Sequence, residues 1–309
     1  MHNESAESLD IQPIPFPGFT FPIGGRVAIV RDEPVEQIVN TINEQGVEAV
    51  TLNCALGWQR EDVSFLAQLP GVKNLSIITS DISGLSALEQ MASLEELNLT
   101  AQTKEIIDFT QLTKLRDFYL YWWPGAASIF QCYWVTSAYF DKLKLNDYSP
   151  LGQLQQLEQL TIANSPIPSL DWLTHLPQLK ELYLFNCRNL SDFTPISQLK
   201  QLRKIHIEGC KQLHDLTFIS SIQALEECNI SGNGELLSVS PLITLKNLKV
   251  LFIERSSTIT DGDLTPITQL PKLAILSFRP KKHYSHKLVK KWKWADLEHP
   301  DVLLKPSSK

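Results

Sequence analysis

His206 and Glu208 are the residues of this chain whose types and spacing come closest to catalytic chemistry. A histidine beside a carboxylate can act as a general base where the surroundings exclude water and tune its pKa. On a strand, side chains two positions apart point the same way, so this pair would lie together on one open face. We interpret it as a surface contact, because an open sheet does not keep water out.

His283 and His286 are a second candidate, because two histidines three positions apart can bind a metal ion. They lie in the segment RPKKHYSHK, residues 279–287, whose lysines would repel a cation. The chain has no glycine-rich phosphate loop and no Gly-x-Ser-x-Gly nucleophile turn. The sequence therefore predicts no enzyme activity, no metal site and no cofactor.

Five cysteines, an odd number, are dispersed along the chain. Cys187 and Cys210 stand at equivalent places of a repeated phrase, so their side chains should run parallel in a buried column as free thiols.

The opening segment MHNESAESLD carries acids instead of the basic start and apolar run of a secretory signal. No stretch approaches the roughly 18 apolar residues needed to cross a bilayer. We predict a cytoplasmic protein.

The elements that position these residues come from a phrase that recurs every 22 or 23 residues. An apolar residue stands at its first, fourth and sixth places, and a small or polar residue stands at its ninth. The clearest copies are LEQLTIANS (157–165), LKELYLFNC (179–187), LRKIHIEGC (202–210), LEECNISGN (225–233) and LKVLFIERS (248–256). This is a leucine-rich repeat, for which the expected period is about 20 to 29 residues.

The phrase predicts a strand whose fourth and sixth places point into the core and whose third, fifth and seventh places point outward. The ninth residue turns inward and satisfies backbone groups at the bend, as an Asn amide or a small Cys can. After it, apolar residues recur every third position, as at Leu190, Phe193, Ile196 and Leu199. That spacing favours 3₁₀ or irregular turns over long helices.

Further copies are predicted in the same register, which makes about eleven repeats. They start near Val47, Val72, Leu94, Leu115 and Phe140 before the clear copies, and at Leu273 after them. This assignment makes the fourth copy long and the fifth copy short. The predicted fold is an α/β solenoid, a curved domain with a parallel sheet on its concave face and 3₁₀ or irregular turns on its convex face.

The connecting segments SDFTPISQLKQL (191–202), LSVSPLITLKNL (237–248) and DLTPITQLPKL (263–273) carry a family resemblance. They resemble the connection of leucine-rich repeat proteins of the 22-residue class, which include bacterial internalins and a nuclear regulatory subunit of a protein phosphatase. The resemblance covers most of residues 47–278. It implies protein recognition by the concave face.

Both ends of the solenoid are expected to be sealed, because a terminal coil exposes apolar surface and strand edges. We predict an irregular Pro/Gly-rich segment at 1–25, a strand–helix cap at 26–46, repeats at 47–278 and a basic cap and tail at 279–309. Pro34 and Gly46 mark the ends of the N-terminal cap helix. The C-terminal cap is predicted as a helix over 285–297, with Leu288, Trp292 and Ala295 facing the last coil.

The outward places predict a partner-binding face that combines aromatic and acidic side chains. Such rings are enriched at the anchors of protein interfaces. The predicted contact residues are Asp117, Tyr119, Tyr121, Trp122, Lys144, Glu181, Tyr183, Phe185, His206, Glu208, Phe252 and Glu254. A long loop of the fourth copy carries further rings, Phe130, Tyr133, Trp134 and Tyr139, which either join this face or fold over their own strand.

Charge is divided unequally along the chain. Residues 279–309 contain nine Lys or Arg and three acids, which gives this segment a net charge of +6. The net charge of the whole chain is −6, so residues 1–278 carry a net charge of −12. An acidic face would attract a basic protein partner, and an immunity-type inhibitor of a basic toxin or effector is our leading hypothesis. The alternatives are an adaptor that targets an enzyme such as a phosphatase, and binding of nucleic acid or an anionic surface by the basic tail.

Overall fold

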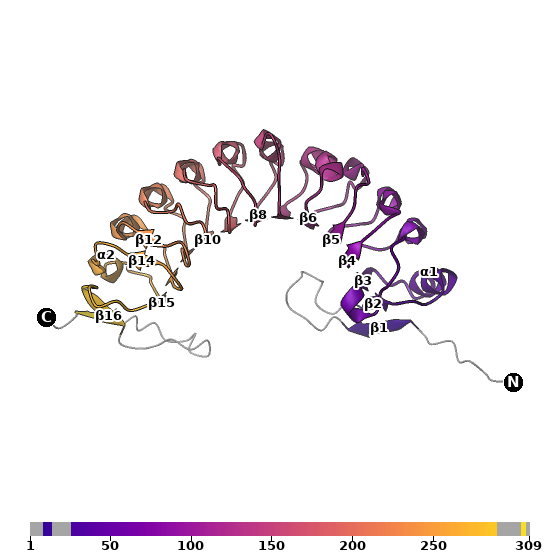
Figure 1. Cartoon of the computed structure of the whole chain (residues 1–309), viewed down its shortest axis with the longest axis horizontal. Helices are drawn as coiled ribbons and strands as arrows, with labels where there is room; N and C mark the ends of the chain where they lie inside the picture. The colour runs from indigo at the N-terminus through magenta and orange to yellow at the C-terminus, as the bar shows by residue number, and fades with distance from the viewer. Residues whose placement is uncertain (1–8, 14–25, 289–303, 307–309) are drawn as a thin grey trace. The chain divides into compact units, whose positions relative to one another are not determined.

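The computed structural model describes residues 9–13, 26–288 and 304–306. The chain divides into two compact units, residues Met1–Phe140 and Asp141–Lys309. Within each unit, the strands line the inner side of the coils and short 3₁₀ helices line the outer side (Figure 1). This is the predicted arrangement of a leucine-rich repeat solenoid.

The first unit begins with an antiparallel pair, β1 (Asp10–Pro13) on β2 (Arg26–Val30). Helix α1 (Val35–Glu44) follows, and then parallel strands stack in chain order. These strands are β3 (Ala49–Asn53), β4 (Asn74–Asp81), β5 (Glu96–Gln102), β6 (Asp117–Tyr121) and β7 (Ser137–Asp141), whose last residue lies in the second unit. The 3₁₀ helices are η1 (Cys54–Leu56), η2 (Ser64–Gln68), η3 (Leu85–Gln90), η4 (Phe109–Gln111) and η5 (Pro124–Gln131).

The second unit repeats the same coil with parallel strands in step. The inner strands are β8 (Gln159–Ala163), β9 (Glu181–Phe185), β10 (Lys204–Glu208), β11 (Glu227–Asn229), β13 (Val250–Ile253) and β15 (Ile275–Phe278). Two small pairs lie outside this stack, β12 (Glu235–Leu236) with β14 (Thr258–Ile259), and β16 (His286–Leu288) with β17 (Leu304–Pro306). The outer turns are η6 (Ser149–Gln153), η7 (Asp171–His175), η8 (Thr194–Gln198), η9 (Thr217–Ser221), η10 (Ser240–Thr244) and α2 (Thr265–Thr268).

The alternation predicted for the strands is confirmed. Leu182 and Leu184 of β9 are fully buried, and so are Ile205 and Ile207 of β10. Their neighbours at places three, five and seven are only partly buried and lie on the open side of the sheet. The apolar series with a spacing of three is buried as well, and it packs the 3₁₀ turns onto the core.

The coils that start at Leu157, Leu179, Leu202, Leu225 and Leu248 turn at the eighth place with a positive φ. Gly209 and Gly232 take this conformation, and so do Asn164 and Asn186, which tolerate it better than most residues do. The two asparagines also bond to each other, because the Asn186 amide donates to the Asn164 oxygen at 3.0 Å. The eighth place therefore forms a column on which successive coils stack.

The ninth place satisfies the backbone at the bend, as predicted. Asn233 is fully buried, donates to the Ile207 carbonyl at 2.7 Å and accepts from the Cys210 N–H at 2.9 Å. Cys187 and Cys210 are buried free thiols in the same column.

Two further cysteines, Cys132 and Cys228, are buried elsewhere in the coils. Burial raises the pKa of each thiol to about 12, so both stay protonated at neutral pH.

The predicted start of the fifth copy near Phe140 is wrong. Strand β7 places Val135 at the first place and Phe140 at the sixth, where it is fully buried. The fourth copy is therefore 20 residues long, from Leu115 to Val135, and the fifth is 22 residues long, so neither is irregular. This register is difficult to recognise in the sequence because Ala138 occupies the fourth place, where other copies carry a larger apolar residue.

Two predictions for the ends of the chain also require correction. Part of the segment at 11–25 is regular, because β1 pairs with β2 and Asp10 forms an ion pair with Arg31 at 2.8 Å. Pro13 is tolerated there because it ends an edge strand. At the other end, His286–Leu288 is a strand and not the start of a helix, since it pairs with Leu304–Pro306. Trp292 and Ala295, which were predicted to face the last coil, lie outside the described residues.

Candidate functional site

The open face of the sheet in the second unit, here called the second-unit face, collects most of the predicted contact residues. Strands β9, β10, β11 and β13 run in register, so His206 lies beside Tyr183 on one side and Asn229 on the other. The face consists of Glu181, Tyr183, Phe185, Lys204, His206, Glu208, Glu227, Asn229, Val250, Phe252, Ile275 and Ser277. Glu254 lies one residue past the end of β13.

An aromatic group occupies one part of this face. The rings of Tyr183 and Phe185 lie 6.4 Å apart and nearly parallel, and His206 meets Tyr183 edge-on at 4.9 Å. The Tyr183 hydroxyl donates to the Glu181 carboxylate at 2.7 Å. Partial burial, that hydrogen bond and the charges of Glu181 and Glu227 raise the pKa of Tyr183. The ring therefore presents a neutral hydroxyl that is held in one orientation.

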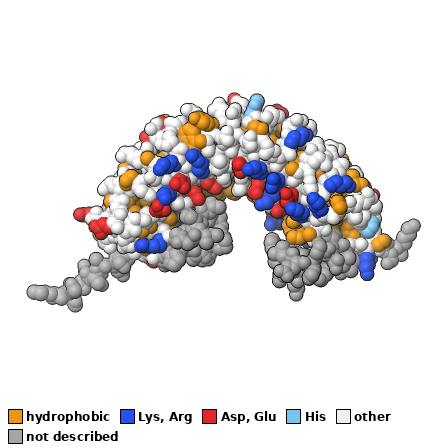
Figure 2. Space-filling model, turned by 180° about the vertical axis from the view of Figure 1, so that it is seen from behind, with side chains coloured by type: hydrophobic (Ala, Val, Ile, Leu, Met, Phe, Trp, Pro, Cys, Tyr) orange, Lys and Arg blue, Asp and Glu red, His pale blue; other side chains and the backbone are white. Residues whose placement is uncertain are grey.

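Acidic side chains on the second-unit face are largely paired with basic side chains of the same face. Lys204 contacts Glu181 at 2.8 Å, and His206 contacts Glu227 at 2.6 Å. The hydrogen bond from His206 lowers the pKa of Glu227. In the view of Figure 2, acidic and basic side chains lie beside one another in groups.

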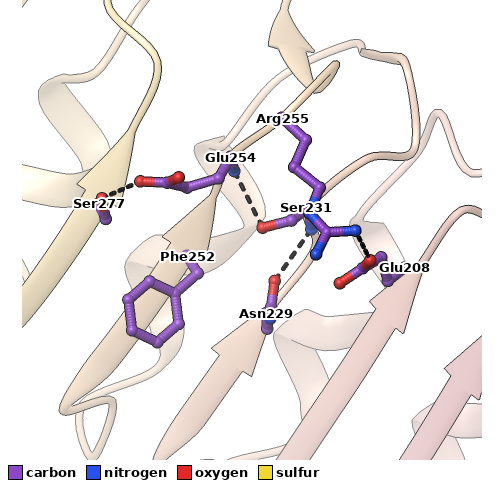
Figure 3. Close-up of a pocket in the computed structure, with 7 residues that line it drawn as sticks. All are labelled: Glu208, Asn229, Ser231, Phe252, Glu254, Arg255 and Ser277. Carbon is purple, nitrogen blue, oxygen red and sulfur yellow. Dashed lines mark hydrogen bonds and ion pairs between the residues drawn. The ribbon is translucent and has the colours of Figure 1, made fainter.

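A pocket of about 400 Å³ opens at the carboxyl ends of strands β10 to β15. Glu208, Phe252, Glu254 and Arg255 line it, together with small polar residues of the neighbouring coils. Arg255 forms an ion pair with Glu208, and the Ser277 hydroxyl donates to Glu254 (Figure 3). In the view of Figure 3, the ring of Phe252 lies below the Glu254–Ser277 pair.

The first unit carries a tyrosine cluster on the outward places of β6 and β7. Tyr119 and Tyr139 stack with their ring centres 4.1 Å apart, and Tyr121 lies two places further along β6. Asp117 begins β6, and burial raises the pKa of its carboxyl although a hydrogen bond from Ser137 opposes this effect. Sequence reasoning placed Tyr139 in a loop, and the register of β7 moves it onto the sheet.

Two predicted contact residues do not lie on an open face. Trp122 is buried, and its ring packs against Phe130 at 5.3 Å and Phe140 at 6.0 Å. Lys144 was assigned from the wrong start of the fifth copy, and it is exposed beyond the end of β7. The hypothesis that the loop rings cover their own strand therefore holds for Trp122 and Phe130, whereas Tyr133 is 62% exposed away from the sheet.

Several residues of the face were missed by the sequence reasoning. Lys204 and Glu227 occupy the third place, which the phrase already marks as outward, so the signal was present in the sequence. Arg255 occupies the eighth place with a φ of 59°, and no signal in the phrase assigns its side chain to the pocket.

The candidate chemical residues are engaged in ordinary contacts. His206 and Glu208 share the face as expected, but each pairs with another residue, Glu227 and Arg255 respectively. His283 bonds to the Ile259 carbonyl at 2.9 Å, and His286 to the Ser285 hydroxyl at 2.8 Å. Within the described ranges, no group of three or more His, Cys, Asp or Glu residues is arranged to hold a metal ion.

Comparisons with known proteins agree with this architecture. A family model described as leucine-rich repeats in two copies matches residues 177–221. The chain has the fold of leucine-rich repeat proteins, and residues 177–221 match the repeat model itself. The predicted resemblance to leucine-rich repeat proteins is thereby confirmed. A search of curated proteins finds no match to this chain.

Solved structures of the same fold come from several sources. An internalin from Listeria monocytogenes is 19% identical with a TM-score of 0.58, and the match covers 84% of this chain and 83% of that one. A leucine-rich repeat protein of Leptospira interrogans is 22% identical with a TM-score of 0.57, covering 75% and 61%. A TDR receptor is 15% identical with a TM-score of 0.57, covering 81% and 46%. At these identities the likeness shows the fold.

Among the residues that the structure describes, no helix is both long enough and apolar enough to span a membrane.

Proposed function

We propose that this leucine-rich repeat protein is a non-catalytic module that binds another protein through the open face of its sheet. One observation carries the proposal: Tyr183, Phe185 and His206 group on adjacent strands, and each of the three side chains is only partly buried. Large rings that are fixed in orientation and still accessible supply contact area at low entropic cost, which is why they anchor interfaces.

The finer proposal is an inhibitor that masks a basic protein in the cytoplasm. Residues 1–278 carry −12, which would accelerate the approach of a basic partner at low salt. Acidic side chains of the second-unit face are largely paired within the protein, so few of them are free for direct contacts with a partner. We therefore expect charge to affect the association rate more than the lifetime of the complex. The five free thiols are consistent with a reducing compartment.

A capture experiment with matched variants tests the binding face. The wild-type chain and its Tyr183→Ala and Tyr133→Ala variants are used to retain proteins from the native cell extract, and the affinity of the retained protein is then measured after purification. Tyr133 is the control, because it is an exposed tyrosine that lies off the sheet. We expect Tyr183→Ala to weaken binding by about 2 kcal/mol, roughly 30-fold, because hot-spot tyrosines contribute on this scale.

Tyr133→Ala should leave the affinity within about twofold of the wild type, as expected for a residue outside the interface. An equal loss in both variants, or none in Tyr183→Ala, would contradict the proposed face. Loss of the partner's activity in a one-to-one complex would support inhibition. A partner that stays active would instead support the targeting alternative.

A further inference from the structure

The pocket at the end of β13 has one aromatic wall. Phe252 stands between Asn229 of β11 and Ser277 of β15 in the strand register, and its ring is half-buried. Phe252 is one of the residues that line the pocket. A ring in this position offers its face, which carries partial negative charge, to whatever enters.

Two carboxylates and one guanidinium set the charge of the pocket, which leaves one negative charge in excess. Arg255 pairs with Glu208, so that carboxylate is neutralised within the protein. Glu254 is exposed and accepts a hydrogen bond from the Ser277 hydroxyl. Among the described residues it forms no ion pair, so Glu254 is the carboxylate that remains for a ligand.

The backbone at Arg255 follows the repeat. The equivalent places of the two preceding coils are Gly209 and Gly232, which adopt positive φ without strain, whereas Arg255 adopts a φ of 59°. Asn164 and Asn186 adopt a positive φ at the same place of earlier coils, so the conformation belongs to the repeat. At this coil it carries the guanidinium of Arg255, which pairs with Glu208 at the pocket.

The combination of a ring face and one uncompensated carboxylate selects a planar cation. A guanidinium can stack on a ring and donate two parallel hydrogen bonds to a carboxylate, whereas an ammonium is a strongly hydrated point charge. An anion such as a phosphate would be repelled by Glu254. We propose that this pocket binds the side chain of an arginine on the partner protein, with Phe252 beneath the guanidinium and Glu254 accepting its hydrogen bonds.

This proposal rests on the proposed function, because it names the chemistry of the partner at the same face. It can be tested without the partner by titrating the full ¹⁵N-labelled chain with the peptide acetyl-Gly-Arg-Gly-amide and following NMR shifts. The citrulline peptide is the matched control, since it keeps the shape of arginine and lacks its charge. We expect saturable shifts at Asn229 and Ser277 with the arginine peptide, and at least tenfold weaker binding of the citrulline peptide.

Variants assign the binding to individual groups. Glu254→Gln and Phe252→Leu should each weaken binding of the arginine peptide by about fivefold or more, in line with one charged hydrogen bond or one cation–π contact. Glu226→Gln is the control, because Glu226 pairs with Lys249 outside the pocket and should leave binding unchanged. Superimposable spectra of the unbound variants would show that the fold is retained.

Three results would overturn the proposal: equal binding of the arginine and citrulline peptides, equal binding of a lysine peptide, or no effect of Glu254→Gln. The failure of this proposal can be distinguished from failure of the proposed function. If the arginine peptide does not bind but Tyr183→Ala still weakens partner binding, the pocket proposal falls and the protein-binding face stands. If the peptide binds but Tyr183→Ala has no effect on the partner, the pocket does bind an arginine side chain, but the proposed contact between Tyr183 and the partner is refuted.

Discussion

At the scale of single residues, Gly209 shows how closely successive coils approach at the eighth place. A Cβ on Gly209 would lie 2.3 Å from the Asn186 Oδ1 atom, and its φ of +72° already disfavours a side chain. Gly232 is the matched control, because its φ is +70° and the nearest atom to its Cβ would be at 3.5 Å. We expect Gly209→Ala to lower the free energy of unfolding by about 2 kcal/mol, and Gly232→Ala by about 1 kcal/mol, since only the first adds a clash to the backbone strain.

Urea denaturation of the two variants measures this difference. Equal losses of stability would mean that the Asn186 side chain moves aside freely, and that the column of eighth-place residues does not restrain the coils.

A second prediction at this scale concerns the Asp117 carboxyl. Its pKa is raised from 3.8 mainly by burial, so the fold favours its neutral form and is destabilised by its charge. The destabilisation is complete at pH values above the folded pKa and disappears below the unfolded pKa. Asp117→Asn should therefore raise the thermal midpoint at pH 7 and give no increase near pH 3. A midpoint that is lowered at pH 7 would show that the charged form makes a stabilising contact.

At the scale of elements, Asn233 tests whether the ninth place holds neighbouring coils together. Replacement by Ala would leave the buried N–H of Cys210 and carbonyl of Ile207 without their partner. Two such groups cost about 2–4 kcal/mol. Asn229→Ala is the control, because Asn229 is half-buried on the open face and accepts one hydrogen bond, from the Ser231 N–H at 3.1 Å, so its replacement should cost only about 1 kcal/mol. A smaller loss for Asn233→Ala than for Asn229→Ala in urea denaturation would contradict this role.

The same scale shows what the sequence could predict. Strands such as β9 and β10 follow from alternation, because every outward place is flanked by a buried leucine or isoleucine. The register of β7 was missed because Ala138 is a weak apolar signal between stronger ones. The pairing of β16 with β17 was also missed, because contact between residues 286 and 306 depends on tertiary packing and leaves no local pattern.

At the scale of the whole molecule, the sequence predicted a repeat scaffold and a binding face, but not which of its charges would be free. Glu181 and Glu208 belong to the acidic surface that the sequence predicts, yet each is paired with a basic residue from another coil. Those partners lie on coils one or two repeats away, and the period of the phrase brings them together only after folding. Tertiary pairing therefore reduces the acidic character that composition suggested for this face.

Site-specific photo-crosslinking tests the central claim most directly. A benzophenone amino acid is placed either at Phe185, on the second-unit face, or at Gln198, which is exposed at the end of η8 on the outer side. Both proteins are irradiated in the native cell extract, and crosslinked species are identified by mass and by gel mobility. The proposed function predicts one dominant partner crosslinked from position 185 and none from position 198. Crosslinking of the partner from position 198 alone would contradict it.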